Sequence, residues 1–194
     1  MSLFNLSDYD TVKSPLLNGR YISSSMLNDV LSKLNNNALI EINDIGKSVK
    51  NKPISIIKIG FGSIKIFFWS QMHGNETTTT KAIIDFLNLL IINNDKDLVK
   101  TLLNRCTLYI IPMLNPDGAD AYTRVNANLV DLNRDAQNLS QPESKILRNA
   151  FNKIKPDYCF NLHGQRTIFG TESSGNSAVA SFLAPAKDNK LSIT

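Results

Sequence analysis

Apolar residues recur along this chain with two different periods, and segments of the two kinds alternate. Runs of β-branched and aromatic residues predict strands at 38–42, 53–59, 64–69, 108–113, 158–162 and 179–183. Apolar stripes at helical spacing predict helices at 26–34, 75–92 and 141–154, with a short helix at 95–103. Strands that alternate with helices favour a three-layer α/β domain around a largely parallel sheet.

The connections between these elements carry their own signals. Phe61-Gly62-Ser63 is a tight connection between two predicted strands, so we expect 53–59 and 64–69 to form a β-hairpin. Residues 43–46 and Pro116-Asp117-Gly118 have the composition of turns. Residues 119–140 are polar and show little periodicity, and a loop of that length in a compact domain is usually functional or disordered.

Polar side chains follow three of the predicted strands directly: His73, Asn115 and His163. In sheets of this kind ligands gather at the carboxyl ends of the strands. His73 and Glu76 lie three residues apart where a strand ends and a helix begins, which suits convergence on a metal ion. His163 is the only other histidine, and it completes the set of three ligands that a catalytic zinc ion typically takes. The alternative is a hydrogen-bonded His73 beside a glutamate that favours the helix dipole.

The long polar segment is dense in groups that recognise anions. Arginine presents a rigid fork for carboxylates, so Arg124 and Arg134, with Asn133, could hold a substrate carboxylate and a developing oxyanion. Asp131 could accept the second ring N–H of a ligating histidine and fix its tautomer. A solvated polar loop explains any one of these residues but explains the set poorly.

Together these motifs resemble those of the zinc metallocarboxypeptidases, peptidase family M14. The resemblance covers roughly residues 45–170. The motifs that carry it are His73-x-x-Glu76, Asn115-Pro116-Asp117-Gly118, Arg124-x-Asn126, Asp131-Leu132-Asn133-Arg134 and Leu162-His163. It implies a three-layer α/β/α sandwich with a mixed central sheet, and one Zn²⁺ per chain bound by His73, Glu76 and His163.

The resemblance also implies roles for the polar loop. Arg124 would stabilise the oxyanion of the tetrahedral intermediate, and Asn133 and Arg134 would bind the substrate's terminal carboxylate. Asp131 would be the partner of His73. The implied reaction is attack of a zinc-polarised water on an amide carbonyl, with a glutamate as general base. The substrate would be a peptide or small amide with a free carboxylate.

The chain departs from the family pattern near the expected site. Asn75 stands where digestive carboxypeptidases have an arginine, and Asp135 stands where asparagine is more usual. Arg166 is a further candidate for binding the substrate's anionic group, with a plain surface arginine as the alternative.

The largest departure lies after His163, which is followed by residues 164–194 only. The acids of that stretch are Glu172 and Asp188, and neither stands where the family has its general base. We therefore expect residues 1–194 to form one incomplete domain that keeps the metal ligands, lacks the base and hydrolyses substrate poorly or not at all.

Two other functions stay open. One is an N-acyl amino acid deacylase similar to aspartoacylase and succinylglutamate desuccinylase, which also use His-Gly-Asn-Glu and Asp-Leu-Asn-Arg. The Asn115-Pro116-Asp117-Gly118 motif favours the peptidase. The other is a module that binds zinc or peptide without catalysis.

Composition and charge indicate the compartment and the classes of partner to exclude, and they say little about the reaction. The net charge of +4 is small and the lysines are scattered, so we expect neither a nucleic-acid surface nor a basic membrane patch. No signal peptide is visible and the apolar runs are too short to span a membrane, which favours the cytoplasm. Cys106 and Cys159 are expected to be buried, reduced thiols rather than a disulfide.

Overall fold

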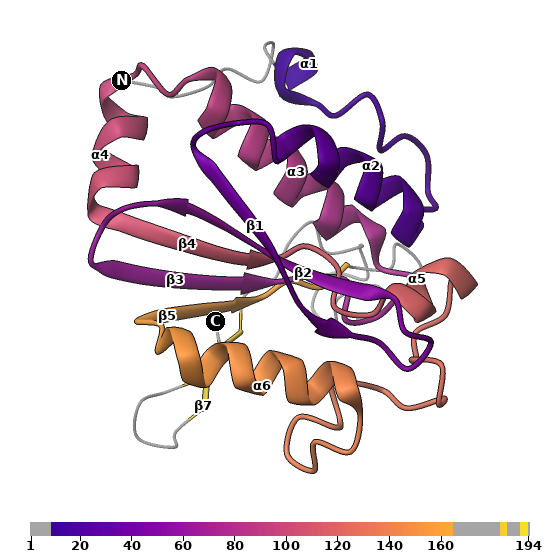
Figure 1. Ribbon diagram of the computed structural model, residues 1–194. Helices are drawn as coiled ribbons and strands as arrows, with labels where there is room; N and C mark the ends of the chain where they lie inside the picture. The colour runs from indigo at the N-terminus through magenta and orange to yellow at the C-terminus, as the bar shows by residue number, and fades with distance from the viewer. Residues whose placement is uncertain (1–8, 165–182, 186–190, 194) are drawn as a thin grey trace. The chain divides into compact units, whose positions relative to one another are not determined.

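The computed structural model describes residues 9–164, 183–185 and 191–193, and the chain divides into two units, Met1–His163 and Gly164–Thr194. The first unit contains a five-stranded sheet in the order β1-β2-β4-β3-β5 (Figure 1). Its strands are β1 (Ile40–Lys47), β2 (Pro53–Gly60), β3 (Ile64–Trp69), β4 (Cys106–Ile111) and β5 (Tyr158–Asn161). β3 pairs in parallel with β4 and β5, whereas β2 pairs antiparallel with β1 and β4.

The second unit has one antiparallel pair, β6 (Leu183–Pro185) with β7 (Leu191–Ile193). The strand predicted at 179–183 lies outside the described residues except for Leu183.

Helices cover both faces of the sheet, because side chains alternate between the faces along each strand. On one face Ile57, Ile59, Leu108 and Ile110 pack against α2 (Ser24–Leu34) and α3 (Thr77–Ile92). On the other face Ile54, Phe67 and Ile111 pack against α6 (Pro142–Ile154). Figure 1 shows α6 and the α2–α3 pair on opposite sides of the sheet. The remaining helices are α1 (Tyr9–Val12), α4 (Asp97–Arg105) and α5 (Pro116–Ala121). The prediction of a mixed α/β sandwich is confirmed.

The predicted hairpin of 53–59 with 64–69 is wrong, because β4 lies between these two strands. Their short connection crosses the beginning of β4: the Phe61 N–H donates to Leu103 O at 2.8 Å, and the Gly62 N–H donates to Cys106 O at 3.3 Å. A Cβ atom on Gly62 would lie 1.8 Å from the backbone carbon of Arg105. A three-residue link is therefore long enough to pass over a strand end when one residue lacks a side chain.

The hairpin of this sheet is formed instead by β1 and β2. The predicted turn at 43–46 is wrong, since β1 continues to Lys47 through a register shift between Asp44 and Gly46. The reversal follows, where the Ser48 N–H donates to Lys52 O at 2.9 Å. A bulge absorbs the polar residues that resemble a turn.

β5 lies at the edge of the sheet and is exposed along its whole length. Tyr158 is 60% exposed and Phe160 is 42% exposed, and the Phe160 ring stacks on Phe68 with centroids 5.0 Å apart. Both cysteines are free, as predicted, but only Cys106 is buried, because Cys159 lies on this edge. Phe151 of α6 is also exposed.

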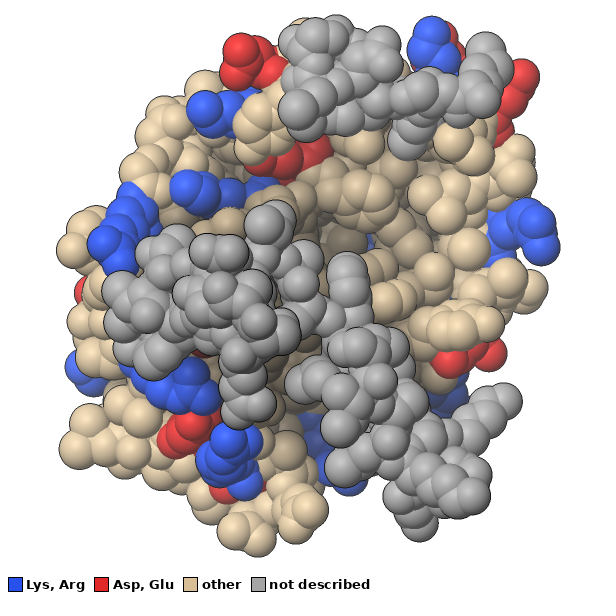
Figure 2. All heavy atoms as spheres, turned by 180° about the vertical axis from the view of Figure 1, so that it is seen from behind, with Lys and Arg blue, Asp and Glu red and all other residues tan. Residues whose placement is uncertain are grey.

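None of the described helices combines the length and the apolar character that crossing a membrane requires. On the face shown in Figure 2, the described Lys and Arg side chains are dispersed among neutral and acidic ones.

The crossing at Gly62 generates a stability prediction. Gly62→Ala should lower the free energy of unfolding by about 2–3 kcal/mol, because the added methyl group meets the backbone of Arg105 and Cys106, where α4 ends and β4 begins. Urea unfolding measures the change. Phe61→Ala, next to it and highly exposed, is the control and should change stability by less than about 0.5 kcal/mol. Equal effects of the two substitutions would contradict the crossing.

Candidate metal centre

The loops that leave β3 and β4 remain bonded to each other beyond the ends of the strands. The Ser70 N–H donates to Ile111 O at 3.0 Å, the Leu114 N–H donates to Ser70 O at 3.1 Å, and the Asn115 N–H donates to Gln71 O at 3.2 Å. Because β3 and β4 are parallel, both loops emerge at the same edge of the sheet. The loop that carries His73 is thereby fixed against the loop that begins at Asn115.

Asn115 and Gly118 fit these two loops together. The Asn115 side chain accepts a hydrogen bond from the Gly118 N–H at 2.8 Å and donates one to Met72 O at 3.2 Å. A Cβ atom on Gly74 would lie 1.9 Å from the carbonyl carbon of Gly118, so the two backbones touch. Pro116-Asp117-Gly118, predicted as a turn, is the start of helix α5 with Asn115 as its N-cap.

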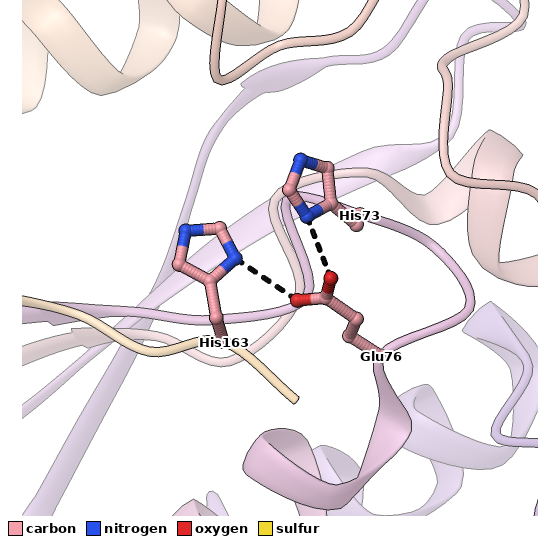
Figure 3. Close-up of side chains that lie close together, drawn as sticks. All are labelled: His73, Glu76 and His163. Atoms are coloured by element: carbon pink, nitrogen blue, oxygen red, sulfur yellow. Dashed lines mark hydrogen bonds and ion pairs between the residues drawn. The ribbon is translucent and has the colours of Figure 1, made fainter. Parts of the chain in front are cut away.

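His73, Glu76 and His163 converge from three different elements, as Figure 3 shows. His73 follows β3, Glu76 is the N-cap of α3, and His163 follows β5. The distance from Nδ1 to a carboxylate oxygen of Glu76 is 2.8 Å for His73 and 2.9 Å for His163. The two imidazole rings are tilted by 36° with centroids 4.8 Å apart. One ligand atom from each residue lies within 4.8 Å of the others, as a shared metal ion requires.

The hydrogen-bond partners of His73 show why a cation is needed at this site. The Nε2 of His73 lies 3.1 Å from Asp131 Oδ1 and its Nδ1 lies 2.8 Å from the Glu76 carboxylate, and a carboxylate only accepts hydrogen bonds. A neutral ring has one N–H, so it can donate to only one of the two carboxylates and presents a lone pair to the other. Two acceptors that face each other repel unless a cation lies between them, either a second ring proton or a metal ion. Two imidazole nitrogens and a carboxylate oxygen are a donor set that suits Zn²⁺.

Asp131 connects the histidine to Arg124. The Arg124 Nε donates to Asp131 Oδ2 at 3.0 Å, and the Asn133 backbone N–H donates to Asp131 Oδ1 at 2.9 Å. Arg124 Nη1 lies 3.5 Å from Glu76 Oε1. Burial raises the pKa of the Asp131 carboxyl, but hydrogen bonds from His73, Asn133 and Arg124 outweigh burial and hold this pKa below its usual value. Asp131 is therefore a carboxylate that orients both His73 and Arg124.

The other predicted site residues are less closely connected. Asn133 is half-buried and Arg134 is exposed, and both follow Asp131 on the same loop. Their role in carboxylate binding stays a prediction. Arg166 lies outside the described residues.

Two polar residues that organise the loop were not predicted to do so. Asn126 is buried: its Oδ1 accepts from the backbone of Asn128 and Val130, and its Nδ2 donates to Gln141 and Glu143. Asp135, seen in the sequence only as a departure from the family, accepts three hydrogen bonds. They come from the Ser140 N–H at 2.9 Å, the Ser140 hydroxyl at 2.7 Å and the Gln141 N–H at 2.9 Å. Nothing in the neighbouring sequence indicates that either side chain makes several hydrogen bonds, because most of their partners lie several residues away.

The family model for zinc carboxypeptidases matches residues 27–178, most of the chain. The chain belongs to the zinc carboxypeptidase family. The resemblance seen in the sequence is thereby confirmed, and the family's members are zinc enzymes.

Two curated relatives are each 34% identical to this zinc carboxypeptidase family member. One is γ-D-glutamyl-L-diamino acid endopeptidase 1 from Lysinibacillus sphaericus, aligned over 68% of this chain and 37% of that protein. The other is carboxypeptidase SOL1 from Arabidopsis thaliana, aligned over 62% of this chain and 28% of that protein. A metallo-carboxypeptidase structure from Pseudomonas aeruginosa has the same fold, with a TM-score of 0.67 at 23% identity over 74% of this chain and 40% of that one. The aligned region is thus 28–40% of these relatives' length.

Asp135 generates a pH prediction. Burial raises the pKa of its carboxyl, but hydrogen bonds from Ser140 and Gln141 together outweigh burial and lower this pKa from an ordinary 3.8 to about 2. A pKa lowered by folding means that ionised Asp135 stabilises the folded state above about pH 4, and that this stabilisation disappears as pH falls through about 2. Asp135→Asn should therefore cost about 1–2 kcal/mol at pH 7 and progressively less below pH 4.

Urea unfolding at pH 7 and at pH 2.5 measures this difference. Asp29→Asn, at an exposed position on α2, is the matched control and should change stability by less than about 0.5 kcal/mol at either pH. A loss for Asp135→Asn that is equally large at both pH values would contradict the assigned hydrogen bonds.

Proposed function

We propose that His73, Glu76 and His163 bind one Zn²⁺, and that the protein is a zinc-dependent hydrolase of peptide or amide bonds. The observation that carries the proposal is that both ring nitrogens of His73 face carboxylates, so a neutral ring leaves one pair of facing acceptors for a cation to separate. His163 presents its own Nδ1 to the second oxygen of the same carboxylate. Membership of the zinc carboxypeptidase family supports the choice of metal and of reaction.

A zinc ion bound there would supply a Lewis acid for the scissile carbonyl and for a water molecule. The residues around it then have separate tasks. Asp131 keeps the proton of His73 on Nε2, so that Nδ1 remains a ligand. The same carboxylate holds Arg124 by Nε, with Nη1 beside Glu76, where the guanidinium can donate to a developing oxyanion.

Substrate recognition is proposed for the loop after Asp131. Asn133 is anchored through its backbone N–H to Asp131, and the exposed guanidinium of Arg134 follows it. We assign these two side chains, with Arg166, to the free carboxylate of a peptide or small amide substrate, because arginine and carboxylate match in shape and charge.

The attacking water also needs a proton acceptor, which the residues assigned so far do not supply. Among the described residues the carboxylates at the centre are Glu76, assigned to the metal, and Asp131, which accepts hydrogen bonds from His73 and Arg124. Neither suits a general base, which must accept the proton of the water. We propose that residues 9–164 do not contain this base.

A second candidate substrate comes from the Lysinibacillus relative, whose name gives an endopeptidase at γ-D-glutamyl-L-diamino acid bonds. A peptide of that type also carries a free carboxylate next to the amide bond, so the same arginines could bind it.

Metal binding is the first test. The protein should bind one Zn²⁺, and His73→Ala or His163→Ala should weaken binding by about 100-fold or more because a ligand is lost. Asp131→Asn should weaken it by about 10–100-fold, since its amide no longer fixes the tautomer of His73. Competition with a chromophoric chelator measures these affinities. Glu41→Gln, an exposed acid on β1, should leave binding unchanged. A wild-type protein that takes up no zinc would refute the centre.

Turnover is the second test. The zinc-loaded 194-residue protein should hydrolyse C-terminal peptide bonds, γ-D-glutamyl-diamino acid peptides and N-acyl amino acids poorly or not at all, because the described residues offer no general base. Mass spectrometry of the products measures this. Robust hydrolysis that chelation abolishes would show that the base is present, and the substrate cleaved would separate a peptidase from a deacylase.

A further inference from the structure

We propose that Gln71 is a positioning residue that sets the distance between His73 and Glu76. Its importance for a metal site rests on the proposed zinc binding, but the structural role does not. Gln71 lies two residues after the end of β3, is fully buried, and adopts a left-handed backbone conformation with φ of 45°. None of the roles proposed so far uses its side chain.

The backbone at Gln71 gives no reason for a glutamine. Residues with a Cβ rarely adopt positive φ, because Cβ crowds the following carbonyl group, and glycine adopts it at much lower cost. The turn is needed because the chain must leave β3 and bend toward α3 within a few residues. A long side chain at the turn must therefore be justified by its contacts.

Both ends of the Gln71 amide have partners. Nε2 donates to Gly74 O at 2.8 Å and faces Ile22 O at 3.4 Å, while Oε1 accepts from the Thr80 hydroxyl at 2.5 Å. Both partners of Nε2 are carbonyl oxygens, which only accept, so the orientation of the amide is determined.

The Thr80 hydroxyl has a single proton and two acceptors within reach, Gln71 Oε1 and, at 2.8 Å, Pro112 O. Pro112 O already accepts from the Ser70 hydroxyl at 2.6 Å. The arrangement that satisfies all groups has Ser70 donating to Pro112 and Thr80 donating to Gln71. Since all these groups are buried, the loss of the Gln71 amide would remove the donor to Gly74 O and leave the Thr80 hydroxyl to share Pro112 O with Ser70.

These contacts connect the two sides of the candidate centre. Gly74 lies in the loop between His73 and Glu76, and Thr80 lies in the first part of α3, the helix that Glu76 caps. A single rigid amide therefore ties the histidine-bearing loop to the helix that carries the glutamate. Metal ligands must be held within about 0.5 Å of their working positions, and support of this kind provides that accuracy.

The test separates the amide from the backbone turn. Gln71→Gly keeps a residue that adopts positive φ and removes the amide, whereas Gln71→Glu keeps the size and the acceptor but cannot donate to Gly74 O when ionised. Both should weaken Zn²⁺ binding by about tenfold, measured by chelator competition. Ile84→Val, at a buried position of α3, is a matched control that disturbs packing. It should leave the zinc affinity within about twofold of the wild-type value. Wild-type zinc affinity in Gln71→Gly would overturn the proposal.

Backbone hydrogen exchange of the metal-free protein gives a readout that does not depend on zinc. In Gln71→Gly the amides of residues 73–76 should exchange at least about tenfold faster than in wild type, while those of β3 and β4 change no more than in Ile84→Val. Unchanged exchange at 73–76 would overturn the role of Gln71. If the wild-type protein binds no zinc, the proposed metal centre fails, and the exchange measurement alone decides the role of Gln71.

Discussion

Parallel pairing of β3 with its two neighbours is the constraint on which the candidate centre depends. It brings the carboxyl ends of β3, β4 and β5 to one edge of the sheet, and His73, Asn115 and His163 follow those ends. The pairing continues past the strands, through Ser70 and Leu114 on one side and through Leu162, whose N–H donates to Trp69 O at 2.9 Å, on the other. The histidines therefore depart from a framework of backbone hydrogen bonds, and their separation does not depend on flexible loops.

The charges at this edge explain why a cation belongs there. Among the described residues, Glu76 and Asp131 contribute two negative charges and Arg124 contributes one positive charge, and imidazoles in the neutral form that binds a metal contribute none. One negative charge remains, close to a histidine that is almost completely buried. Leaving it uncompensated is costly in a medium less polar than water, and a divalent ion more than neutralises it.

The sequence supports the site better than it supports the sheet. The sequence puts His73 and His163 shortly after predicted strands, and the structure brings the two rings together. This could be expected because the strands and their alternation with helices are visible locally, and parallel strands end at one edge of the sheet. Which strands pair with β2 and β3 depends on residues far away in the sequence. The short link between β2 and β3 is therefore compatible both with a hairpin and with a connection that crosses the beginning of β4. Likewise, Pro116-Asp117-Gly118 has turn composition, yet the Asn115 cap makes it a helix start. Asn126, Asp135 and Gln71 lie among residues of similar polarity, and only their distant partners distinguish them.

The exposed edge of β5 has a thermodynamic consequence. In the described part of the chain no strand pairs with the outer side of β5, and its four residues are held to the sheet by β3 alone. His163 lies two residues after this strand, so ordering of the strand and positioning of the histidine share one entropy cost. A chain segment that paired with the outer side of β5 would order the strand and so offset part of that entropy cost. By linkage, this segment would increase the affinity of the centre for its cation without contacting the cation. The cation would in turn favour the pairing by the same factor.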